Sequence, residues 1–324
     1  MADIDFKDRK ILYQLDLDSR QSFRSIGRKV GLSKDTVTTR VKKMQDEGVI
    51  QNFYTIIDTS PLGYTHPRFY LNYQYVTPEI KQEIIDYFVN SKYVGFVHSI
   101  EGQYDLALVM VVKNVPRFNY FWERTMMKYR NYFANHVFSL YYRESMYEYS
   151  FLLPEDKIEK SDRYRVEVFG GENQEEIDDL DHKILKIITP NARIPVSEIA
   201  QKLDSTAVTI NNRIKKLMKK GVIVGFKVNM DFPKLGYKFY KADINLKEPK
   251  KRNKIIKYVE TNPYLNHIIK AIGYVDLELL FYLENANQLH EIMSDISVKF
   301  PDAIKNYSYF SIIKVHKWNY LPEK

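Results

Sequence analysis

The chain carries the same sequence pattern twice. Residues 4–64 and 177–237 align at a constant offset of 173 positions without gaps, and 21 of the 61 aligned positions are identical. Further along, the segment Gly102–Leu106 (GQYDL) matches Gly273–Leu277 (GYVDL). A repeat of this length indicates two duplicated modules, each large enough to bury a core of its own, and excludes a solenoid of short units.

Composition narrows the class of protein. The chain of 324 residues has no cysteine, which excludes disulfides, cysteine zinc sites and thiol catalysis and fits a reducing compartment. No apolar run approaches the ~20 residues of a membrane span, and the charged start, MADIDFKDRK, lacks the apolar stretch of a signal peptide. We therefore expect a cytoplasmic protein without a membrane partner. The net charge of +8 favours a polyanionic partner.

Each copy begins with three helical patterns. In copy one, apolar spacing predicts helices over residues 8–17 and 22–30, and a third helix from an N-cap at Ser33 to Glu47. Val37, Val41 and Met44 form the buried face of the third helix. The segment VIQNFYTIID that follows alternates and predicts a strand or a small hairpin. Three helices and a β wing make a winged helix-turn-helix.

The second part of each copy predicts the order β-α-β-β-α-β, which is ferredoxin-like. The last strands are expected over residues 137–142 and 304–314. The fold class is therefore α+β, with two winged helix-turn-helix modules each followed by a ferredoxin-like domain. The predicted boundaries are 1–64 and 177–237 for the winged modules, 65–152 and 238–324 for the ferredoxin-like domains, and 153–176 for a charged linker with a candidate strand at 164–169.

The third helix of each copy is the candidate DNA-reading element. Its buried residues leave small hydroxyls and cations on the outward face. Such side chains suit a major groove, because cations meet phosphates and base edges while small side chains permit close approach. The predicted DNA-binding residues are Ser33, Lys34, Thr36, Thr38, Thr39, Arg40, Lys42 and Lys43 in copy one, and Thr209, Asn211, Asn212, Arg213, Lys215 and Lys216 in copy two.

Positive charge is concentrated on this element in copy one. Residues 19–45 hold eight Lys or Arg and one acid, a net charge of +7, whereas residues 192–218 hold five and two, a net charge of +3. We expect copy one to carry most of the DNA binding. For copy two, DNA contact and a merely solvated helix face stay open. Asn211 and Asn212 have the chemistry to read adenine, although an exposed asparagine often only solvates.

The chain resembles the Lrp/AsnC (feast/famine) family of transcription regulators. The patterns that carry the resemblance are D-x-x-D-x-K-I-L from Asp5, R-x-S-x-x-x-I-G-x-x-V-G-L-S from Arg20, V-x-x-R-V-K-K-M-x-x-x-G-V-I from Val37 and D-x-x-x-L-G-Y from Asp58. The resemblance covers nearly the whole chain as two fused copies. It implies double-stranded DNA as a partner, and ferredoxin-like domains that dimerise and bind an amino acid or related effector.

The resemblance also implies the ligand-binding residues. They are Gly102, Tyr104, Asp105, Gly273, Val275 and Asp276, in the glycine-aspartate loop of each copy. A plain turn capped by the aspartate is an equally weighted interpretation of these loops. Fusion of two copies implies a pseudo-dimer within one chain, with the two sheets face to face, and further homo-oligomerisation stays open.

Several residues depart from the family pattern or could suggest another kind of site. The second turn, Leu203–Thr206, lacks the glycine that copy one has at position 31. His98 aligns with Ile269 and not with His267, so we expect no shared metal or haem site and no cofactor. The carboxylates of Glu175, Glu176, Asp178 and Asp179 are interpreted as solvating charge.

An enzyme is the rival hypothesis. Siroheme decarboxylases resemble the same family, are built from tandem copies and use the winged module without binding DNA. Their pattern has a His-Asn-Tyr run and an Asn before the third strand. This chain has His98-Ser99-Ile100 and Asp105, which favour a regulator and not an enzyme. A third hypothesis, a sensor that has lost DNA binding, conflicts with the cation-rich helix of copy one.

Overall fold

The computed structural model describes residues 3–154, 163–170 and 174–321. The helices are α1 (Phe6–Leu17), α2 (Phe23–Val30), α3 (Lys34–Asp46), α4 (Pro78–Val89), α5 (Val115–Tyr129), α6 (Asp179–Ile188), α7 (Val196–Lys202), α8 (Ala207–Lys219), α9 (Arg252–Val259) and α10 (Ala286–Lys299). The strands are β1 (Ile50–Ile57), β2 (His66–Tyr73), β3 (Val94–Gly102), β4 (Leu106–Met110), β5 (Phe133–Tyr147), β6 (Arg165–Val168), β7 (Ile223–Met230), β8 (Lys238–Leu246), β9 (Leu265–Ile272), β10 (Leu277–Leu283) and β11 (Ile304–Trp318). Short 3-10 turns are η1 (Ser60–Leu62), η2 (Arg130–Tyr132), η3 (Ser150–Leu152), η5 (Pro233–Leu235) and η6 (Pro249–Lys251).

The three-helix part of each copy forms as the sequence predicts. Ser33 caps α3 by accepting a hydrogen bond from the Thr36 amide at 3.0 Å. The turn before α3 places Gly31 in the left-handed region at φ 70°. Its counterpart in copy two is Asp204, which takes φ 47°. Aspartate tolerates this conformation better than most residues, so the second turn keeps its shape without glycine.

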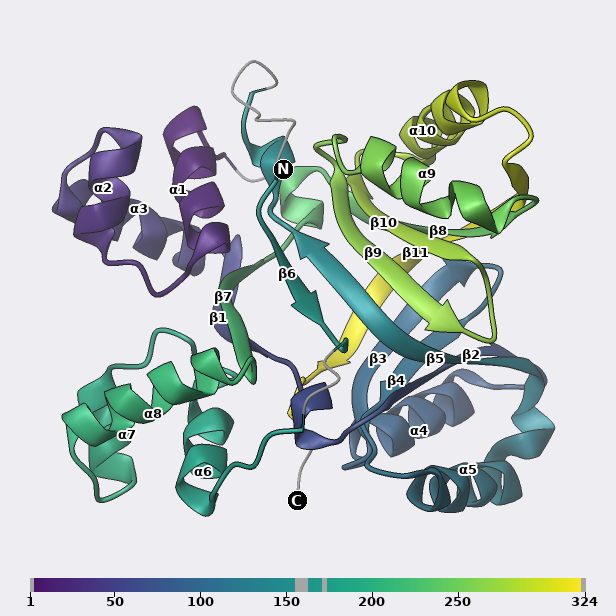
Figure 1. Ribbon diagram of the computed structural model, residues 1–324, viewed down its shortest axis with the longest axis horizontal. Helices are drawn as coiled ribbons and strands as arrows, with labels where there is room; N and C mark the ends of the chain where they lie inside the picture. Colours follow the sequence, from purple (N-terminus) through teal and green to yellow (C-terminus); the bar gives the residue numbers. More distant parts are fainter. Residues whose placement is uncertain (1–2, 155–162, 171–173, 322–324) are drawn as a thin grey trace.

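The β element of each winged module differs from a hairpin wing. Copy one contributes the single strand β1 and copy two the single strand β7, and these pair with each other in antiparallel register. The wing prediction was therefore half right: a strand forms, but its partner lies in the other copy. The ribbon of β1 and β7 fixes the two three-helix modules next to each other at one end of the molecule (Figure 1).

The two ferredoxin-like halves join into one closed barrel. Within them the strand orders are β5-β2-β4-β3 and β11-β8-β10-β9. The edge strand β3 pairs with β11, and β9 pairs with β5, all antiparallel, so the strands of the two halves form a closed ring in the described part of the chain. Helices α4, α5, α9 and α10 lie outside the ring (Figure 1). The predicted face-to-face sheets are thus also joined at both edges.

Strands β5 and β11 are longer than predicted because each serves both halves. β5 pairs with β2 of its own half through residues 133–141 and with β9 of the other half through residues 140–146. β11 does the same with β8 and β3. The expectations of 137–142 and 304–314 therefore covered only part of each strand. Closure removes the exposed strand edges that an open sheet would present.

The linker segment supplies an additional strand. A strand forms where the candidate strand at 164–169 was expected: β6 pairs with the end of β5, and Val166 and Val168 are buried. Residues 155–162 and 171–173 of the predicted linker lie outside the described residues. Within the described residues, no helix is both long and apolar enough to cross a membrane.

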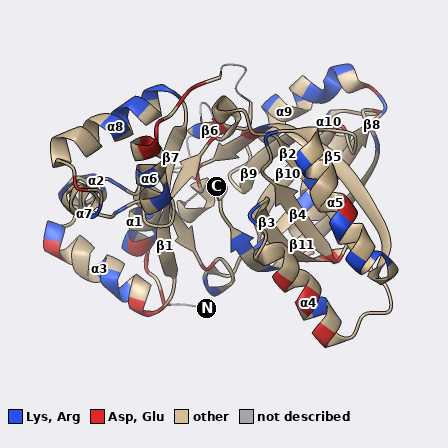
Figure 2. Cartoon of the chain, turned by 90° about the horizontal axis from the view of Figure 1, so that it is seen from below, with Lys and Arg blue, Asp and Glu red and all other residues tan. Residues whose placement is uncertain are grey.

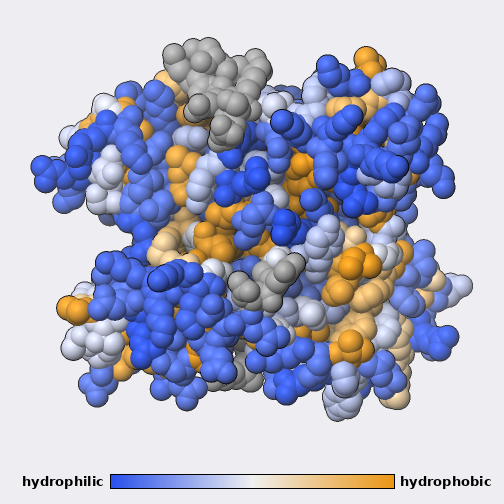
Figure 3. All heavy atoms as spheres, viewed as in Figure 1, coloured by the Kyte–Doolittle hydropathy of each residue, from blue (hydrophilic) through white to orange (hydrophobic). Residues whose placement is uncertain are grey.

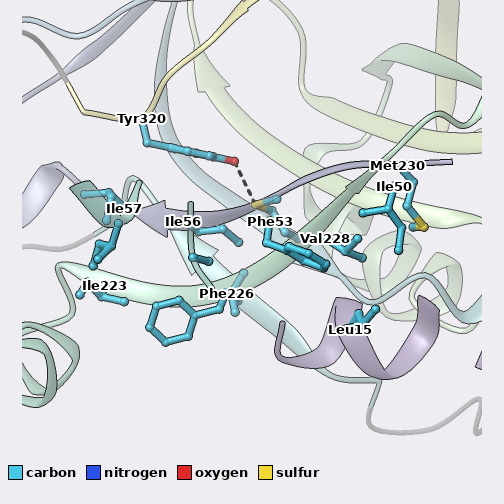
Figure 4. Packing of buried hydrophobic residues seen from close by; sticks show 14 of the residues in the cluster. Leu15, Ile50, Phe53, Ile56, Ile57, Ile223, Phe226, Val228, Met230 and Tyr320 are labelled. Carbon is cyan, nitrogen blue, oxygen red and sulfur yellow. Dashed lines mark hydrogen bonds between the residues drawn. The ribbon is translucent and has the colours of Figure 1, made fainter. Parts of the chain in front are cut away.

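The hydrophobic cores do not follow the domain boundaries. Each ferredoxin-like half has its own core between sheet and helices. The two winged modules instead share one continuous core, in which Leu15 and Phe53 of copy one pack with Phe226 and Val228 of copy two (Figure 4). Apolar residues gather on the surface where these modules meet the barrel (Figure 3). The expectation of a separate core for every module is therefore wrong for the winged modules.

Candidate nucleic-acid interface and the barrel interior

Helix α3 presents most of the predicted residues to solvent. Lys34, Thr39, Lys42 and Lys43 are exposed, and Val37, Val41 and Met44 are buried below them. The hydroxyls of Ser33, Thr36 and Thr38 are exposed as well, but they already bond within the helix: Thr38 donates to the Lys34 carbonyl at 2.9 Å. Lys and Arg lie along both α3 and α8 (Figure 2). Lys43 also lies 3.7 Å from the exposed Glu47. The exposed cations can therefore meet phosphates without loss of core contacts.

Arg40 has a structural role that helical periodicity did not reveal. Its guanidinium lies 2.8 Å from Asp5 and 2.9 Å from Asp8, the two residues of the capping box that starts α1. The Asp8 amide hydrogen bond, and then Arg40, hold the pKa of the Asp5 carboxyl below its usual value. In this conformation Arg40 ties α3 to α1, and this structural role is additional to its predicted DNA contact.

The same arrangement recurs in copy two. Arg213 pairs with Asp178 and lies 3.3 Å from Asp181, in the capping box that starts α6. Asp178 therefore caps a helix and is not merely solvating charge. Glu175 likewise forms an ion pair with Lys220 at 3.1 Å. Arg213 therefore has the same structural role as Arg40, since both guanidinium groups bind the capping box of the first helix of their copy.

Helix α8 presents a different face. Asn211, Asn212, Lys215 and Lys216 are exposed, and Thr209 is half-buried beside the N-cap Thr206, whose hydroxyl oxygen accepts a hydrogen bond from the Thr209 amide at 3.1 Å. Ala207 is exposed and Val208 has 71% of its surface exposed. Most of the apolar surface of Val208 is therefore in contact with solvent.

Reciprocal contacts fix the two modules about a pseudo-two-fold axis. The Ser19 amide donates to the Phe226 carbonyl at 2.8 Å, and the corresponding Ala192 amide donates to the Phe53 carbonyl at 2.8 Å. Arg20 donates to the Ala192 carbonyl at 2.6 Å, and Arg193 donates to the Ser19 carbonyl. Burial lowers the pKa of both arginines, which remain charged at neutral pH. The positions of α3 and α8 are thus set by matched hydrogen bonds.

The glycine-aspartate loops act as structural turns. The Asp105 carboxylate accepts a hydrogen bond from the Tyr73 amide at 2.8 Å, and the Asp276 carboxylate accepts one from the Leu246 amide at 2.8 Å. Each aspartate thereby fastens its loop to the end of the first strand of its half. Gly102 has φ 137°, and a Cβ there would lie 2.8 Å from the Tyr309 carbonyl oxygen. Of the two interpretations of these loops, the geometry favours the capped turn.

The remaining predicted ligand residues differ in their exposure. Gly273 is exposed at φ 90°, and Val275 is half-buried. Tyr104 is buried and stacks on Tyr70 with ring centroids 4.9 Å apart. The loop tyrosines Tyr104 and Tyr274 meet across the barrel, with their hydroxyls 3.4 Å apart. The structure therefore brings the two loops together, as the resemblance implied, but their side chains fill the space between them.

The barrel interior holds a buried ionic network that sequence reasoning missed. Arg68 and Lys241, which occupy corresponding positions of the two copies, both bind Glu278, at 2.7 Å for the Arg68 Nη2 atom and 2.8 Å for Lys241. Lys241 also binds Asp243, which accepts a hydrogen bond from Tyr274 at 2.9 Å. Burial alone would raise the pKa of Glu278, but Arg68 and Lys241 outweigh burial and keep that pKa below its usual value.

Next to this network lies a cavity of about 80 Å³. His98 on β3 and His267 on β9 both line it. Burial lowers the pKa of His98 to about 4, and its Nε2 atom is buried without a hydrogen-bond partner among the described residues. His267 contacts Glu144. The two histidines do not correspond in the repeat, yet barrel closure brings both to one cavity, which no sequence alignment of the copies would indicate. Among the described residues no group of three or more His, Asp or Glu is placed to hold a metal ion.

A larger cleft separates the winged modules from the barrel. Its volume is about 970 Å³, and it is lined by residues of β1, β7 and β11. The charged side chains along it are Lys186, Lys238, Lys314 and Asp231, and the aromatic ones include Tyr54 and Trp318. The cleft therefore lies between the β1–β7 ribbon, to which the recognition helices are attached, and the barrel strand β11.

Comparisons with known proteins agree with this architecture. Residues 5–51 and 177–224 each match a family described as winged helix-turn-helix DNA-binding. An uncharacterized HTH-type transcriptional regulator of Pyrococcus furiosus is 33% identical over 141 residues, which is 43% of this chain and 95% of that protein. Regulatory protein AsnC of Haemophilus influenzae is 33% identical over 119 residues, 36% of this chain and 79% of that protein. The chain thus carries two winged helix-turn-helix modules of the kind that these transcription regulators have. It belongs to the Lrp/AsnC family.

The fold as a whole resembles a tandem enzyme. The siroheme decarboxylase NirDL matches over 98% of this chain and 94% of its own, with a TM-score of 0.64 and 12% sequence identity. At that identity the likeness shows the shared fold, in which two winged modules and two ferredoxin-like halves occur together.

Proposed function

We propose that the protein is a regulator that binds specific sequences of double-stranded DNA through α3 and α8 together. The observation that carries the proposal is the reciprocal clamp of Ser19, Phe53, Ala192 and Phe226, because it holds two cation-bearing recognition helices in a fixed mutual position. Paired helix-turn-helix modules bind half-sites about one helical turn apart, ~34 Å, so that a fixed separation favours specific binding. We propose no catalytic role for the chain.

Selection from a random pool of DNA duplexes tests this function. The full chain should enrich a sequence that protects more than one helical turn, and its affinity for that sequence should exceed its affinity for random duplex by about 10³-fold or more. The control is the variant Lys42→Ala/Lys43→Ala, which should lose affinity for the selected sequence and for random duplex. Enrichment of no sequence by a folded chain would refute specific DNA binding.

We also propose that an amino acid or similar small metabolite modulates DNA binding. Because the glycine-aspartate loops are closed by their own side chains, the cleft between β1, β7 and β11 is the better candidate site. Lys238 and Lys314 suit a carboxylate and Asp231 suits an ammonium group. A ligand there would touch both the module ribbon and the barrel, and it would shift DNA affinity if it favoured one relative position.

Calorimetry with the twenty amino acids tests the effector. Heat with one of them that is lost in Lys314→Ala, but kept in Asp105→Asn, would support the cleft. Heat lost in Asp105→Asn alone would return the site to the loops, and no heat with any amino acid would remove this class of effector.

A siroheme decarboxylase-like enzyme is the alternative that one observation favours. The likeness in fold to NirDL spans almost the whole chain, and two histidines line the barrel cavity. The cavity of about 80 Å³ is, however, well below the 300–1,000 Å³ typical of ligand pockets. Addition of sirohaem to the purified chain, followed by absorbance and by carbon dioxide release, tests it. Release that disappears in His98→Ala would establish the enzyme.

A further inference from the structure

The two recognition helices of this chain are unlike at specific positions, and we propose that its operator is non-palindromic, with a half-site containing G·C pairs under α3 and a half-site rich in A·T pairs under α8. The proposal rests on the proposed function and adds what each helix reads. It concerns the fused chain itself, since a dimer of identical subunits would present the same helix twice.

The positions that the two helices share have structural or electrostatic roles. Both have a hydroxyl residue as N-cap, Ser33 and Thr206, and both use an arginine to bind the capping box of the first helix. Both carry a pair of exposed lysines towards the C-terminal end. The buried positions hold apolar residues in both, which are Val37, Val41 and Met44 in α3 and Ile210, Ile214 and Leu217 in α8. These shared features fix the helix and meet phosphates, and phosphate contacts carry no sequence information.

Six exposed positions differ between the two helices, and four of them lie in the N-terminal half. Read at the repeat offset of 173, Lys34 corresponds to Ala207, Asp35 to Val208, Thr38 to Asn211 and Thr39 to Asn212. All eight side chains are exposed. In helix-turn-helix proteins the N-terminal residues of the recognition helix contact the base edges. Four of the exposed substitutions therefore lie where base sequence is read, and the other two, Gln45 to Met218 and Asp46 to Lys219, lie at the C-terminal end.

The chemistry of the two faces predicts different bases. On α3, Lys34 can donate to the acceptors of guanine and Asp35 can accept from the amino group of cytosine, so this face favours G·C pairs. On α8, Asn211 and Asn212 can bond adenine in a bidentate manner, while Ala207 and the 71% exposed Val208 can pack on thymine methyl groups. The largely exposed side chain of Val208 would be buried in an A·T-rich groove.

The fold fixes which faces are presented together. The reciprocal bonds of Ser19 to Phe226 and of Ala192 to Phe53 join the two modules of one chain, and β1 pairs with β7 of the same chain. Each unit therefore presents one α3 and one α8. A site with two unlike halves also gives the bound chain a single orientation on DNA.

Site selection followed by rearranged duplexes tests the proposal. The wild-type chain should enrich a two-part site with unlike halves. A duplex in which the second half is replaced by an inverted copy of the first should bind at least about ten-fold more weakly, because it places mismatched base pairs under α8. Enrichment of a palindrome that the wild-type chain binds equally well would overturn the proposal and leave DNA binding intact.

A variant with matched faces separates this inference from the proposed function. Ala207→Lys/Val208→Asp/Asn211→Thr/Asn212→Thr gives α8 the outward face of α3 without changing its buried or arginine positions. This variant should now select the palindrome of the α3 half-site. Circular dichroism establishes that it folds. If the variant selects the wild-type site, the four positions do not read bases; if neither chain selects any site, the proposed function fails as well.

Discussion

Asp16 of α1 and Lys227 of β7 form a buried ion pair between the two copies, with the charged atoms 2.6 Å apart and the side chains 0% and 3% exposed. Asp16 also accepts a hydrogen bond from the Tyr149 amide at 2.9 Å. The corresponding positions on the other side of the pseudo-two-fold axis are Thr189 and Tyr54. The pair therefore breaks the symmetry of the repeat and distinguishes the two sides of the β1–β7 ribbon.

Removal of either Asp16 or Lys227 should destabilise the fold, because the other charge would stay buried without a partner. Asp16→Ala leaves Lys227 buried without a counter-ion and should lower the free energy of unfolding by about 3–5 kcal/mol. Urea denaturation measures the change. The exposed pair of Lys202 and Glu198 is the control, since Glu198→Ala should cost less than about 1 kcal/mol. The double variant Asp16→Leu/Lys227→Met should recover most of the loss, and a double variant as unstable as Asp16→Ala would show that the cost is not one of unpaired charge.

DNA binding should be carried unequally by the two copies. Lys42→Ala/Lys43→Ala should weaken duplex binding more than Lys215→Ala/Lys216→Ala does, because the first pair belongs to the segment of net charge +7 and the second to that of +3. Each lost phosphate contact should also flatten the dependence of log affinity on log salt concentration by about 0.9. Fluorescence anisotropy at several salt concentrations measures both quantities. Equal losses in the two variants would contradict the asymmetry.

Arg40→Ala should lower the stability of the fold more than it weakens DNA binding. The guanidinium joins α3 to the capping box of α1 at a half-exposed position, so its loss should lower stability by about 1 kcal/mol. The salt dependence of DNA binding should stay close to that of the wild type, because the guanidinium is already paired with Asp5 and Asp8. Thermal melting and anisotropy together separate the two roles, and a flattened salt dependence with unchanged melting would show that DNA contact is the main role of Arg40.

Val41→Asp should disrupt both winged modules and spare the barrel. Val41 is 2% exposed within the core that the two modules share, so an unpaired carboxylate there weakens copy two as well as copy one. Amide hydrogen exchange should show lost protection in α3 and α8, while α5 and α10, which pack in separate cores, stay protected. Protected amides in α8 would mean that the second module is stable alone.

Stability should fall as the pH falls below about 6.5. Burial lowers the pKa of His66 to about 3, below its ordinary value of about 6.5, so the unfolded chain takes up the proton first. The stabilising contribution of neutral His66 is complete above pH 6.5 and is lost towards pH 3, with a slope of about 1.4 kcal/mol per pH unit. Urea denaturation at pH 7 and pH 5 should show a smaller difference for His66→Gln than for the wild type or for the exposed control His290→Gln.

Local patterns in the sequence predicted the elements but not their partners. The three helices, their caps and the ferredoxin-like order follow from periodicity and capping residues that lie within a few positions of each other. The extent of β5 and the pairing of β1 with β7 depend on strands more than a hundred residues away, for which no local signal exists.

The candidate site shows the same division. Periodicity correctly placed Lys34 and Lys42 on the exposed face of α3. It did not reveal that Arg40 binds the capping box of α1, because that box lies on another helix. A signal was present, since Asp5, Asp8 and Arg40 all recur unchanged as Asp178, Asp181 and Arg213. The ionic network in the barrel was not predicted, because Arg68 and Glu278 lie in different copies and come into contact only when the barrel closes.

Because β3 pairs with β11 and β9 with β5 within one chain, the two-module form does not depend on protein concentration. A regulator assembled from separate subunits loses its two-module form on dilution, because its stability depends on subunit concentration. Here the second module is tethered to the first, so the two-module unit forms by a unimolecular reaction. The fraction of chains that can bind with both modules is therefore the same at a few copies per cell as at many. At low abundance, the occupancy of a single operator by one such unit rises in simple proportion to copy number.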